Sequence, residues 1–417
     1  MQNKTLDVYY KGKHVGTLAE SPERLIAFQY SDDWLKTGFS LNPLNLPLKS
    51  GVFLPPDRTR QASQGLFGVF NDSLPDSWGT LLMDRKLQQD GIDPGNLSAI
   101  DRLAYIGASG MGALEYHPSK RETYNIDTVG LDYDQIAMEV SNVLSSKPTD
   151  KLDLLYELGA SAGGTRPKIL LHEDNKDWIV KFPANSDYAI SGKCEYDYSV
   201  CAKKCGIAMT QTELVPSKLG DGYFKTERFD RKDGQKIYTA TAAGLLDVDF
   251  RAPTCDYETY MKLVKILTHD NQADKKQMFS AMCFNVLTHN RDDHTKNISF
   301  IFDESAGWRL SPMYDLTYSD TFFGEQTTSV NGKGKDITDK DFIEIGKGAG
   351  LSESQCATLL NKVRSNIPML SEYLDQKGVE KVQDISWLDR LKELSSDRSA
   401  DICVSDSTAD RPYDLEM

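Results

Sequence analysis

The segment Asp292-Asp293-His294-Thr295-Lys296-Asn297 decides the fold of this 417-residue chain. It is a polar run in which an aspartate at 292 precedes an asparagine at 297. The sequence on either side is apolar in regular patterns: residues 278–287 repeat at helical spacing, and residues 298–302 form a short apolar run. These patterns predict a helix that leads into the loop and a strand that leads out of it. The loop therefore carries a carboxylate and an amide between two buried elements, where both can face one ligand.

The spacing of Asp292 and Asn297 is the one at which protein kinases carry a catalytic aspartate and a metal-binding asparagine. Phosphoryl transfer requires that ATP phosphates are held, that Mg²⁺ has oxygen ligands and that the acceptor hydroxyl is oriented. In this loop Lys296 could reach the γ-phosphate, and His294 could contact the nucleotide. Because the spacing also occurs by chance, a polar surface turn is the alternative.

A second carboxylate, Asp315, lies among apolar residues in the segment 310–316. An aspartate in such surroundings is costly to bury without a partner, and a metal ion is a suitable partner. Kinases carry their second metal-binding carboxylate at this place, after a hairpin. The chain has no Asp-Phe-Gly sequence here, and a helix-capping or turn aspartate is the alternative.

Lys181 stands inside the apolar run Trp178-Ile179-Val180-Lys181-Phe182. A lysine in a buried strand needs an anionic partner, and kinases use such a lysine to hold the α- and β-phosphates, paired with a helix glutamate. Glu195 follows in the next predicted helix and is the candidate partner. A lysine that protects an edge strand is the alternative.

Two further segments complete a candidate nucleotide site. The loop 159–168 is rich in small residues that let backbone N–H groups approach phosphates, although an ordinary connection would look similar. Glu227, Arg228 and Phe229 end a predicted strand where a kinase hinge would meet adenine, and a plain strand end is the alternative. The glycine-rich stretch 107–112 lacks the strand–loop–helix context of a phosphate loop, so we expect a tight turn there.

Composition limits the classes of protein that fit. The chain is 39% hydrophobic and 26% charged, as expected of a globular protein with two or three domains. Its net charge of −14 provides no basic field for nucleic acid. Seven cysteines without a CxxC pair argue against disulfides and zinc, and the helical spacing of Cys194, Cys201 and Cys205 predicts core positions. The absence of a signal or membrane-length apolar run predicts a cytoplasmic protein without membrane contact.

The order of predicted elements indicates an α+β, bilobed protein-kinase-like fold with a small N-terminal β-rich subdomain and a mainly helical C-terminal lobe. The polar residues 117–130 separate the N-terminal strands and helices from the rest. The segment 395–417 carries six acidic and two basic residues and is expected to be disordered. We predict an N-terminal subdomain at 1–125, a linker helix at 126–149, an ATP-binding region at 150–254, a helical lobe with the catalytic loop at 255–394, and an acidic tail at 395–417.

Together these segments resemble the HipA family of bacterial serine/threonine kinases, the toxin half of HipA/HipB-type toxin–antitoxin pairs. The resemblance extends from residue 5 to about residue 390 and rests on several separated motifs in the expected order. These motifs are residues 67–79, 101–107, 163–168, 180–183, 227–231, 290–297 and 312–316.

The resemblance implies a role for each candidate residue. Asp292 would be the catalytic base, Asn297 and Asp315 the Mg²⁺ ligands, and Lys181 the phosphate-binding lysine. The ATP site would also comprise Ala162, Gly163, Gly164, Thr165, Arg166, Pro167 and Lys168 in the loop, Glu227, Arg228 and Phe229 at the hinge, and His294, Lys296, Asn297 and Asp315 on the nucleotide side.

Ser161 falls where family members autophosphorylate, which in the family expels the loop and stops ATP binding. A phosphoserine dianion beside the ATP phosphates would repel them. The pair Arg166-Pro167 differs from the best-known toxins, so the mobility of this loop is open.

The implied function is a kinase that uses ATP and Mg²⁺, inhibits translation and growth, and is restrained by a small helix-turn-helix antitoxin that alone contacts DNA. Protein substrates of the family include aminoacyl-tRNA synthetases, but nothing in this chain selects one. Two alternatives remain: a kinase of this fold without a toxin role, and a non-catalytic co-repressor scaffold for a DNA-binding partner. The presence of Asp292, Asn297 and Asp315 together argues against the scaffold.

Overall fold

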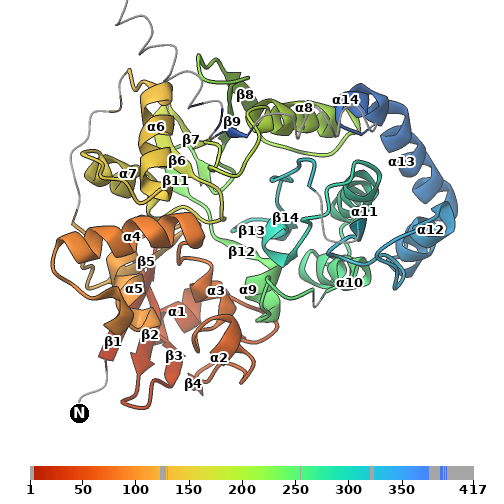
Figure 1. The fold of residues 1–417 in the computed structure, drawn as a ribbon. Helices are drawn as coiled ribbons and strands as arrows, with labels where there is room; N and C mark the ends of the chain where they lie inside the picture. The colour runs from red at the N-terminus through yellow and green to blue at the C-terminus, as the bar shows by residue number, and fades with distance from the viewer. Residues whose placement is uncertain are drawn as a thin grey trace, which may run out of the picture.

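A computed structural model describes residues 4–122, 128, 130–253, 255–319, 324–374, 386, 387, 389 and 391. Its N-terminal unit is built on a five-stranded antiparallel sheet of order β4-β3-β2-β1-β5 (Figure 1). From Leu6 to Tyr10, side chains alternate between buried and half-buried along β1, as expected of a sheet with one face on the core. The strands are β1 (Lys4–Tyr10), β2 (Lys13–Glu20), β3 (Ile26–Tyr30), β4 (Val52–Phe53) and β5 (Leu114–His117).

Two helices of this unit, Asp32–Thr37 and Ala99–Ile106, pack against that sheet. The main helix of this unit begins at Ser77. Pro75 precedes it, and the residue before a proline is pushed out of the helical region, so the helix does not extend back through Leu74. The helices are α1 (Asp32–Thr37), α2 (Thr59–Ala62), α3 (Gly68–Asn71), α4 (Ser77–Gln89) and α5 (Ala99–Ile106).

A second antiparallel sheet, of order β6-β7-β9-β8, forms the next unit. Its apolar side chains share a core with α4, α6 and α7. The indole N–H of Trp78 on α4 donates to the carbonyl of Lys168 on β6 at 3.0 Å, which joins the two units. The elements are α6 (Tyr133–Leu144), α7 (Leu152–Gly159), β6 (Lys168–Glu173), β7 (Lys176–Lys181), α8 (Ser191–Lys204), β8 (Thr212–Val215) and β9 (Tyr223–Glu227).

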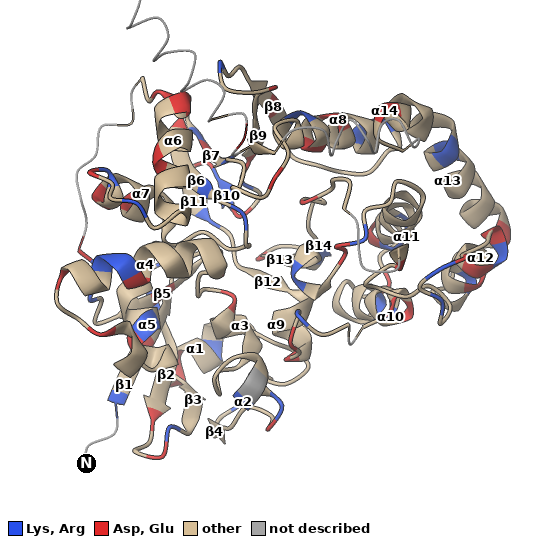
Figure 2. Ribbon diagram, viewed as in Figure 1, with Lys and Arg blue, Asp and Glu red and all other residues tan. Residues whose placement is uncertain are grey.

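The remaining elements are mainly helical and lie beside the second unit, with a small sheet of order β12-β13-β14 facing the other two units (Figure 1). The helix α12, at the outside of this third unit, carries both acidic and basic residues (Figure 2). The elements are β10 (Arg231–Lys232), β11 (Gln235–Lys236), β12 (Thr239–Thr241), α9 (Ala242–Leu246), α10 (Tyr257–Leu267), α11 (Gln272–Leu287), β13 (Ser299–Asp303), β14 (Gly307–Leu310), α12 (Asp339–Gly348), α13 (Glu353–Asn366) and α14 (Ser371–Leu374).

The predicted α+β class is confirmed, and so are the core positions of Cys194, Cys201 and Cys205, which are all buried. The helix and strand expected on either side of the loop at 292–297 are α11 and β13. Within the described ranges, no helix is long and apolar enough to cross a membrane. The predicted acidic tail at 395–417 lies outside the described residues.

Candidate active site

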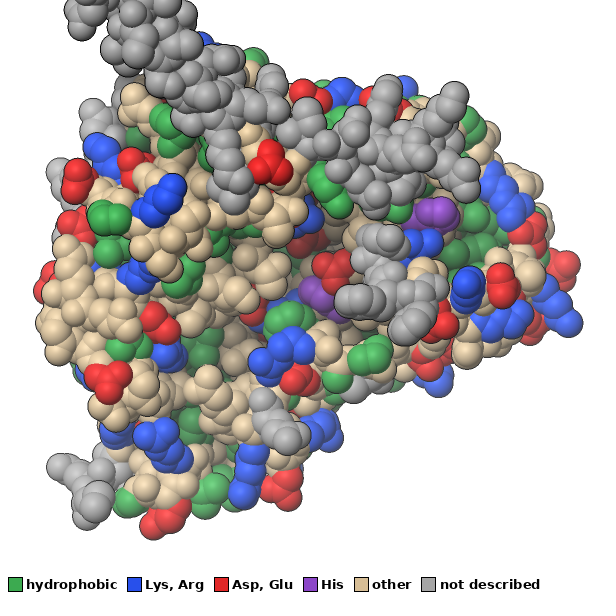
Figure 3. All heavy atoms as spheres, in the orientation of Figure 1, with side chains coloured by type: hydrophobic (Ala, Val, Ile, Leu, Met, Phe, Trp, Pro, Cys, Tyr) green, Lys and Arg blue, Asp and Glu red, His purple; other side chains and the backbone are tan. Residues whose placement is uncertain are grey.

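A cleft lies where the three units meet, with an internal space of about 180 Å³. Figure 3 shows a hollow in this face of the molecule, with acidic, basic and histidine side chains at its edge. Most of the residues expected at an ATP site line the cleft, whereas Ser161, Arg166 and Pro167 do not. The expected residues that do line it are Ala162, Gly163, Gly164, Thr165, Lys168, Lys181, Glu227, Arg228, Phe229, Asp292, His294, Lys296, Asn297 and Asp315.

Lys181, at the end of β7, lies between two carboxylates. Its ammonium group donates to Glu195 on α8 at 2.5 Å and to Asp315 from the far side of the cleft. Burial alone disfavours the charge, but the two carboxylates outweigh it and raise the pKa of Lys181 above its usual value. The same pairing overcomes the effect of burial on Asp315 and holds its pKa well below the usual range. Lys181 thus links Glu195 on one side of the cleft to Asp315 on the other.

Asp315 has a left-handed backbone with φ of 57°. This region is uncommon for residues other than glycine, and such strain of about 1–3 kcal/mol persists only where the surroundings impose it. The neighbouring Tyr314 hydroxyl donates to the carbonyl of Lys296 at 2.6 Å, which ties the segment to the loop at 292–297. Strained residues of this kind concentrate at functional sites.

The two adjacent aspartates of the loop have opposite environments. Asp293 is buried and accepts hydrogen bonds from the Tyr257 hydroxyl at 2.6 Å and the Thr328 amide at 3.0 Å. Burial raises its pKa to about 6. The Asp292 side chain is 66% exposed and points into the cleft, while its backbone N–H donates to Ser319 Oγ at 2.9 Å. Asp293 therefore anchors the loop and leaves Asp292 free for chemistry.

Asn297 and Asp315 each keep an oxygen atom free. The Asn297 amide nitrogen donates to the carbonyl of Asp292 at 2.7 Å. Among the described residues, neither the Asn297 amide oxygen nor Asp315 Oδ2 accepts a hydrogen bond. Carboxylate and amide oxygens are suitable ligands for Mg²⁺, which is usually held by one or two protein groups together with substrate phosphates and water. The residues present thus fit a Mg²⁺ site.

The loop before β6 is folded back on itself. Lys168 is buried and donates to the carbonyl of Gly163 at 2.8 Å, and burial beside the charge of Lys181 lowers its pKa to about 8. Gly164 has φ of 85°, which only glycine adopts readily. The Arg166 guanidinium lies 3.4 Å from Asp187. Burial disfavours its charge, but Asp187 and the nearby carboxylates Glu195, Asp315 and Asp292 raise its pKa.

Asp76 reaches this site from the N-terminal unit. Its Oδ2 accepts the N–H of Gly164 at 2.6 Å, and its Oδ1 contacts the ammonium group of Lys296. Lys296 also lies 4.7 Å above the ring of Phe250. Asp76 was not among the predicted site residues, because no local pattern distinguishes an aspartate that caps a helix from one that crosses to another unit.

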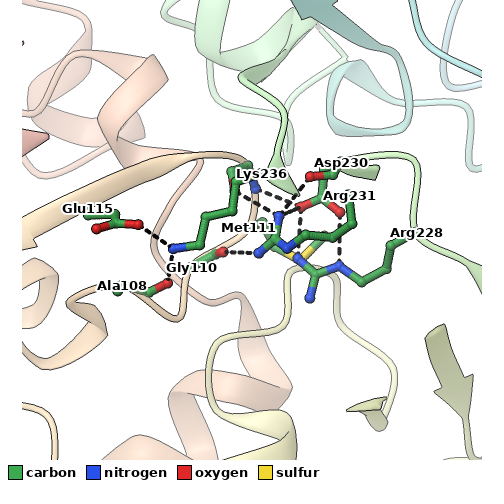
Figure 4. Close-up of polar contacts among 9 residues, drawn as sticks. Ala108, Gly110, Met111, Glu115, Arg228, Asp230, Arg231 and Lys236 are labelled. Atoms are coloured by element: carbon green, nitrogen blue, oxygen red, sulfur yellow. Dashed lines mark hydrogen bonds and ion pairs between the residues drawn. The ribbon is translucent and has the colours of Figure 1, made fainter. Parts of the chain in front are cut away.

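The predicted hinge is fixed to the N-terminal unit by buried ions (Figure 4). Both Arg228 and Arg231 donate to the carboxylate of Asp230, each at 2.7 Å, and the Gly112 N–H donates to it at 2.8 Å. Burial opposes the charge, but the two guanidinium groups lower the pKa of Asp230 to about 2. The turn at 107–112 is confirmed as the lead into β5, and its Met111 side chain also lines the cleft.

A strand lysine paired with a helix glutamate, set across a cleft from a D-x-x-x-x-N loop, defines a protein-kinase-like site. The chain belongs to the HipA family. The family model described as HipA-like C-terminal domain matches residues 160–370, and the model of the HipA N-terminal domain matches residues 6–117.

Relatives and solved structures agree with this assignment. The serine/threonine-protein kinase toxin HipA of Shewanella oneidensis is 24% identical over 356 residues, covering 76% of each chain. Y4mE of Sinorhizobium fredii, named as a candidate kinase, is 24% identical over 382 residues, covering 85% of this chain and 83% of that protein. A structure of Shewanella oneidensis MR-1 HipA with HipB and its operator DNA matches with a TM-score of 0.67 at 19% identity, covering 95% of this chain and 99% of that chain. The fold is therefore the predicted bilobed kinase-like fold of the HipA type.

Proposed function

We propose that this chain is a non-specific serine/threonine protein kinase that uses Mg·ATP. The observation that carries the proposal is the contact of Lys181 with both Glu195 and Asp315 in a cleft that also holds Asp292 and Asn297. A lysine that only protected a strand edge would not be buried between carboxylates from two other elements. The names of the relatives support the same class of activity.

Each residue has a role that its position supports. Asp292 would orient the acceptor hydroxyl and take its proton, which suits a carboxylate that is exposed within the cleft. Lys181 and the loop at 162–168 would hold the phosphates, and the segment 227–229 would border the adenine. Asn297 and Asp315 would hold Mg²⁺, which when bound neutralises charge on the phosphates.

We further infer that Ser161 is an inhibitory autophosphorylation site. Its side chain is buried with only 3% exposure, beside the loop at 162–168. A phosphate dianion is too costly to bury there without cationic partners, so modification would drive the loop out. This would remove Gly164 and Lys168 from the cleft and stop ATP binding.

We also propose that the chain is the toxin of a type II toxin–antitoxin pair, which phosphorylates a cytoplasmic protein and is restrained by a small HipB-like helix-turn-helix antitoxin. The support is the structural likeness to HipA in a complex with HipB and operator DNA. The net charge of −14 favours contact with DNA through that partner alone. The division of the chain at 125, 149, 254 and 394 stays part of this proposal.

Intact-mass spectrometry of the purified chain after incubation with Mg·ATP tests the enzyme and the site together. We expect the mass of one added phosphate, located on Ser161 by peptide sequencing, and no change in Asp292→Asn. A wild-type mass that does not change, or an equal gain in the variant, would contradict the proposal.

Expression in a host that lacks the antitoxin distinguishes a toxin from a kinase without a toxin role. We expect growth arrest with the wild-type chain and normal growth with Asp292→Asn at the same protein level. Normal growth with an active wild-type enzyme would favour a kinase without a toxin role.

A further inference from the structure

The Asp76 carboxylate accepts hydrogen bonds from two donors that line the candidate ATP site. One is the backbone N–H of Gly164, which lies 2.6 Å from Oδ2, and the other is the ammonium group of Lys296, which contacts Oδ1. A backbone N–H carries a single hydrogen. Gly164 therefore cannot serve a phosphate oxygen while Asp76 holds it.

The electrostatics of the contact point in the same direction. The side chains of Asp76 and Lys296 are both only 12% exposed, so solvent screens their charges weakly. A phosphate that approached Lys296 would meet the carboxylate at short range, and like charges at that distance repel strongly. The carboxylate must leave before a phosphate can take its place.

The Asp76 side chain makes these contacts in place of a capping hydrogen bond to its own helix. It is the N-cap residue of α4, a position where an aspartate ordinarily accepts a backbone N–H of its own helix, yet its side chain makes no capping hydrogen bond. Its partners lie 88 and 220 residues away in the sequence. The first turn of α4 thus offers a second place for the carboxylate once it is displaced.

We propose that the Gly164 N–H and the Lys296 ammonium group form the subsite for the terminal phosphate of ATP, and that Asp76 fills this subsite as an internal competitor when nucleotide is absent. The inference rests on the proposed kinase function and adds a residue of the N-terminal unit to it. Binding of the terminal phosphate then requires exchange of one anion for another. Adenosine, which lacks phosphates, leaves Asp76 in place.

Calorimetric titration of the full chain tests the exchange, with adenosine and the Mg²⁺ complex of the non-hydrolysable imido analogue of ATP as probes. Asp76→Asn removes the charge, and Asp76→Ser removes it while keeping a capping hydroxyl for α4. Asp84→Asn is the matched control, because Asp84 lies on the same helix and pairs with Arg102 at 2.7 Å, outside the cleft.

We expect both Asp76 variants to bind the ATP analogue about tenfold more tightly than the wild-type chain, with adenosine binding unchanged. Asp84→Asn should match the wild type with both probes. Normal adenosine binding together with unchanged or weaker binding of the analogue would overturn the competitor role and leave the kinase proposal standing. If the wild-type chain binds neither probe, the kinase proposal fails and this inference fails with it.

Discussion

At the scale of single residues, the adjacent Asp292 and Asp293 differ in exposure: Asp292 is the proposed catalytic base, and Asp293 holds the loop in place. They are neighbours of identical type, but one is exposed in the cleft and the other is buried under Tyr257 and Thr328. The spacing to Asn297 was enough to select Asp292 as the candidate base. The anchoring role of Asp293 was not predictable, because its partners come from segments about 35 residues away on either side.

Replacement of each aspartate by asparagine should therefore affect different properties. Asp292→Asn should lower phosphoryl transfer by about 100- to 10,000-fold and leave the melting temperature unchanged, since its side chain is exposed. Asp293→Asn should cost about 1–3 kcal/mol of unfolding free energy through its hydrogen bonds. Kinase assays and thermal denaturation of both variants check this, and equal melting temperatures for the two would contradict it.

The pKa of Asp293 predicts a component of stability that depends on pH. Its pKa is about 6 in the folded chain against 3.8 as the ordinary value, so the folded state binds its proton more tightly. The component is thus fully present below about pH 4 and is lost as the pH rises through about 6. Denaturant titrations from pH 4 to 7 should show this downward trend in the wild type relative to Asp293→Asn. Parallel curves for the two proteins would count against it.

At the scale of elements, α4 packs against the loop at 160–164, which is proposed to hold the phosphates. A Cβ atom added at Gly79, in the first turn of α4, would lie 2.7 Å from the carbonyl oxygen of Ala160 and 3.0 Å from that of Ala162. These oxygens belong to backbone and cannot move aside cheaply. The glycine at 79 thus allows the N-terminal unit to approach the loop.

Gly79→Ala should separate α4 from this loop. We expect a loss of about 1–3 kcal/mol in unfolding free energy, together with weaker ATP binding. Gly348→Ala is the control, because a Cβ at that exposed position in α12 meets nothing within 4 Å and should stabilise the chain by about 0.5–1 kcal/mol. Denaturant unfolding measures both, and a Gly79→Ala chain as stable as the control would refute the contact.

Apolar patterns were enough to predict α11 and β13, and α6 lies within the predicted linker helix. The predictions fail where tertiary contacts determine the end of a strand or the direction of a loop side chain. The strand expected over 223–229 stops at Glu227, because Arg228 turns inward to pair with Asp230. Residues 162–168 were expected to line the ATP site, but Arg166 and Pro167 do not line the cleft, and Arg166 pairs with Asp187. Such pairings depend on which segments meet in space, and local sequence does not encode them.

At the scale of the whole molecule, the N-terminal unit is part of the candidate active site. It supplies Asp76 at the phosphate end and Met111 beside the hinge, and it is bound to the hinge through Gly112 and Asp230. The sequence predicted an N-terminal subdomain ahead of the kinase-like part of the chain. It did not predict that residues of both parts line one cleft, because the spacing of apolar residues along the chain carries no information about contacts between units.

Asp230→Asn should loosen the N-terminal unit from the rest of the chain. It leaves Arg228 and Arg231 in a buried site without their carboxylate, so we expect a loss of about 3–5 kcal/mol. Asp249→Asn breaks the more exposed ion pair with Arg251 and should cost at most about 1 kcal/mol. Denaturant unfolding and limited proteolysis of the two variants check this, and similar losses in both would contradict the account.

The central claim, that the cleft transfers phosphate, is tested most directly by following the labelled γ-phosphate of ATP into protein. The purified chain is incubated with Mg²⁺ and labelled ATP, alone and in a bacterial lysate. The account predicts label on serine or threonine with the wild-type chain, and none with Asp292→Asn, with Asp315→Asn or after chelation of Mg²⁺. No label with the wild type, or equal label with Asp292→Asn, would contradict it.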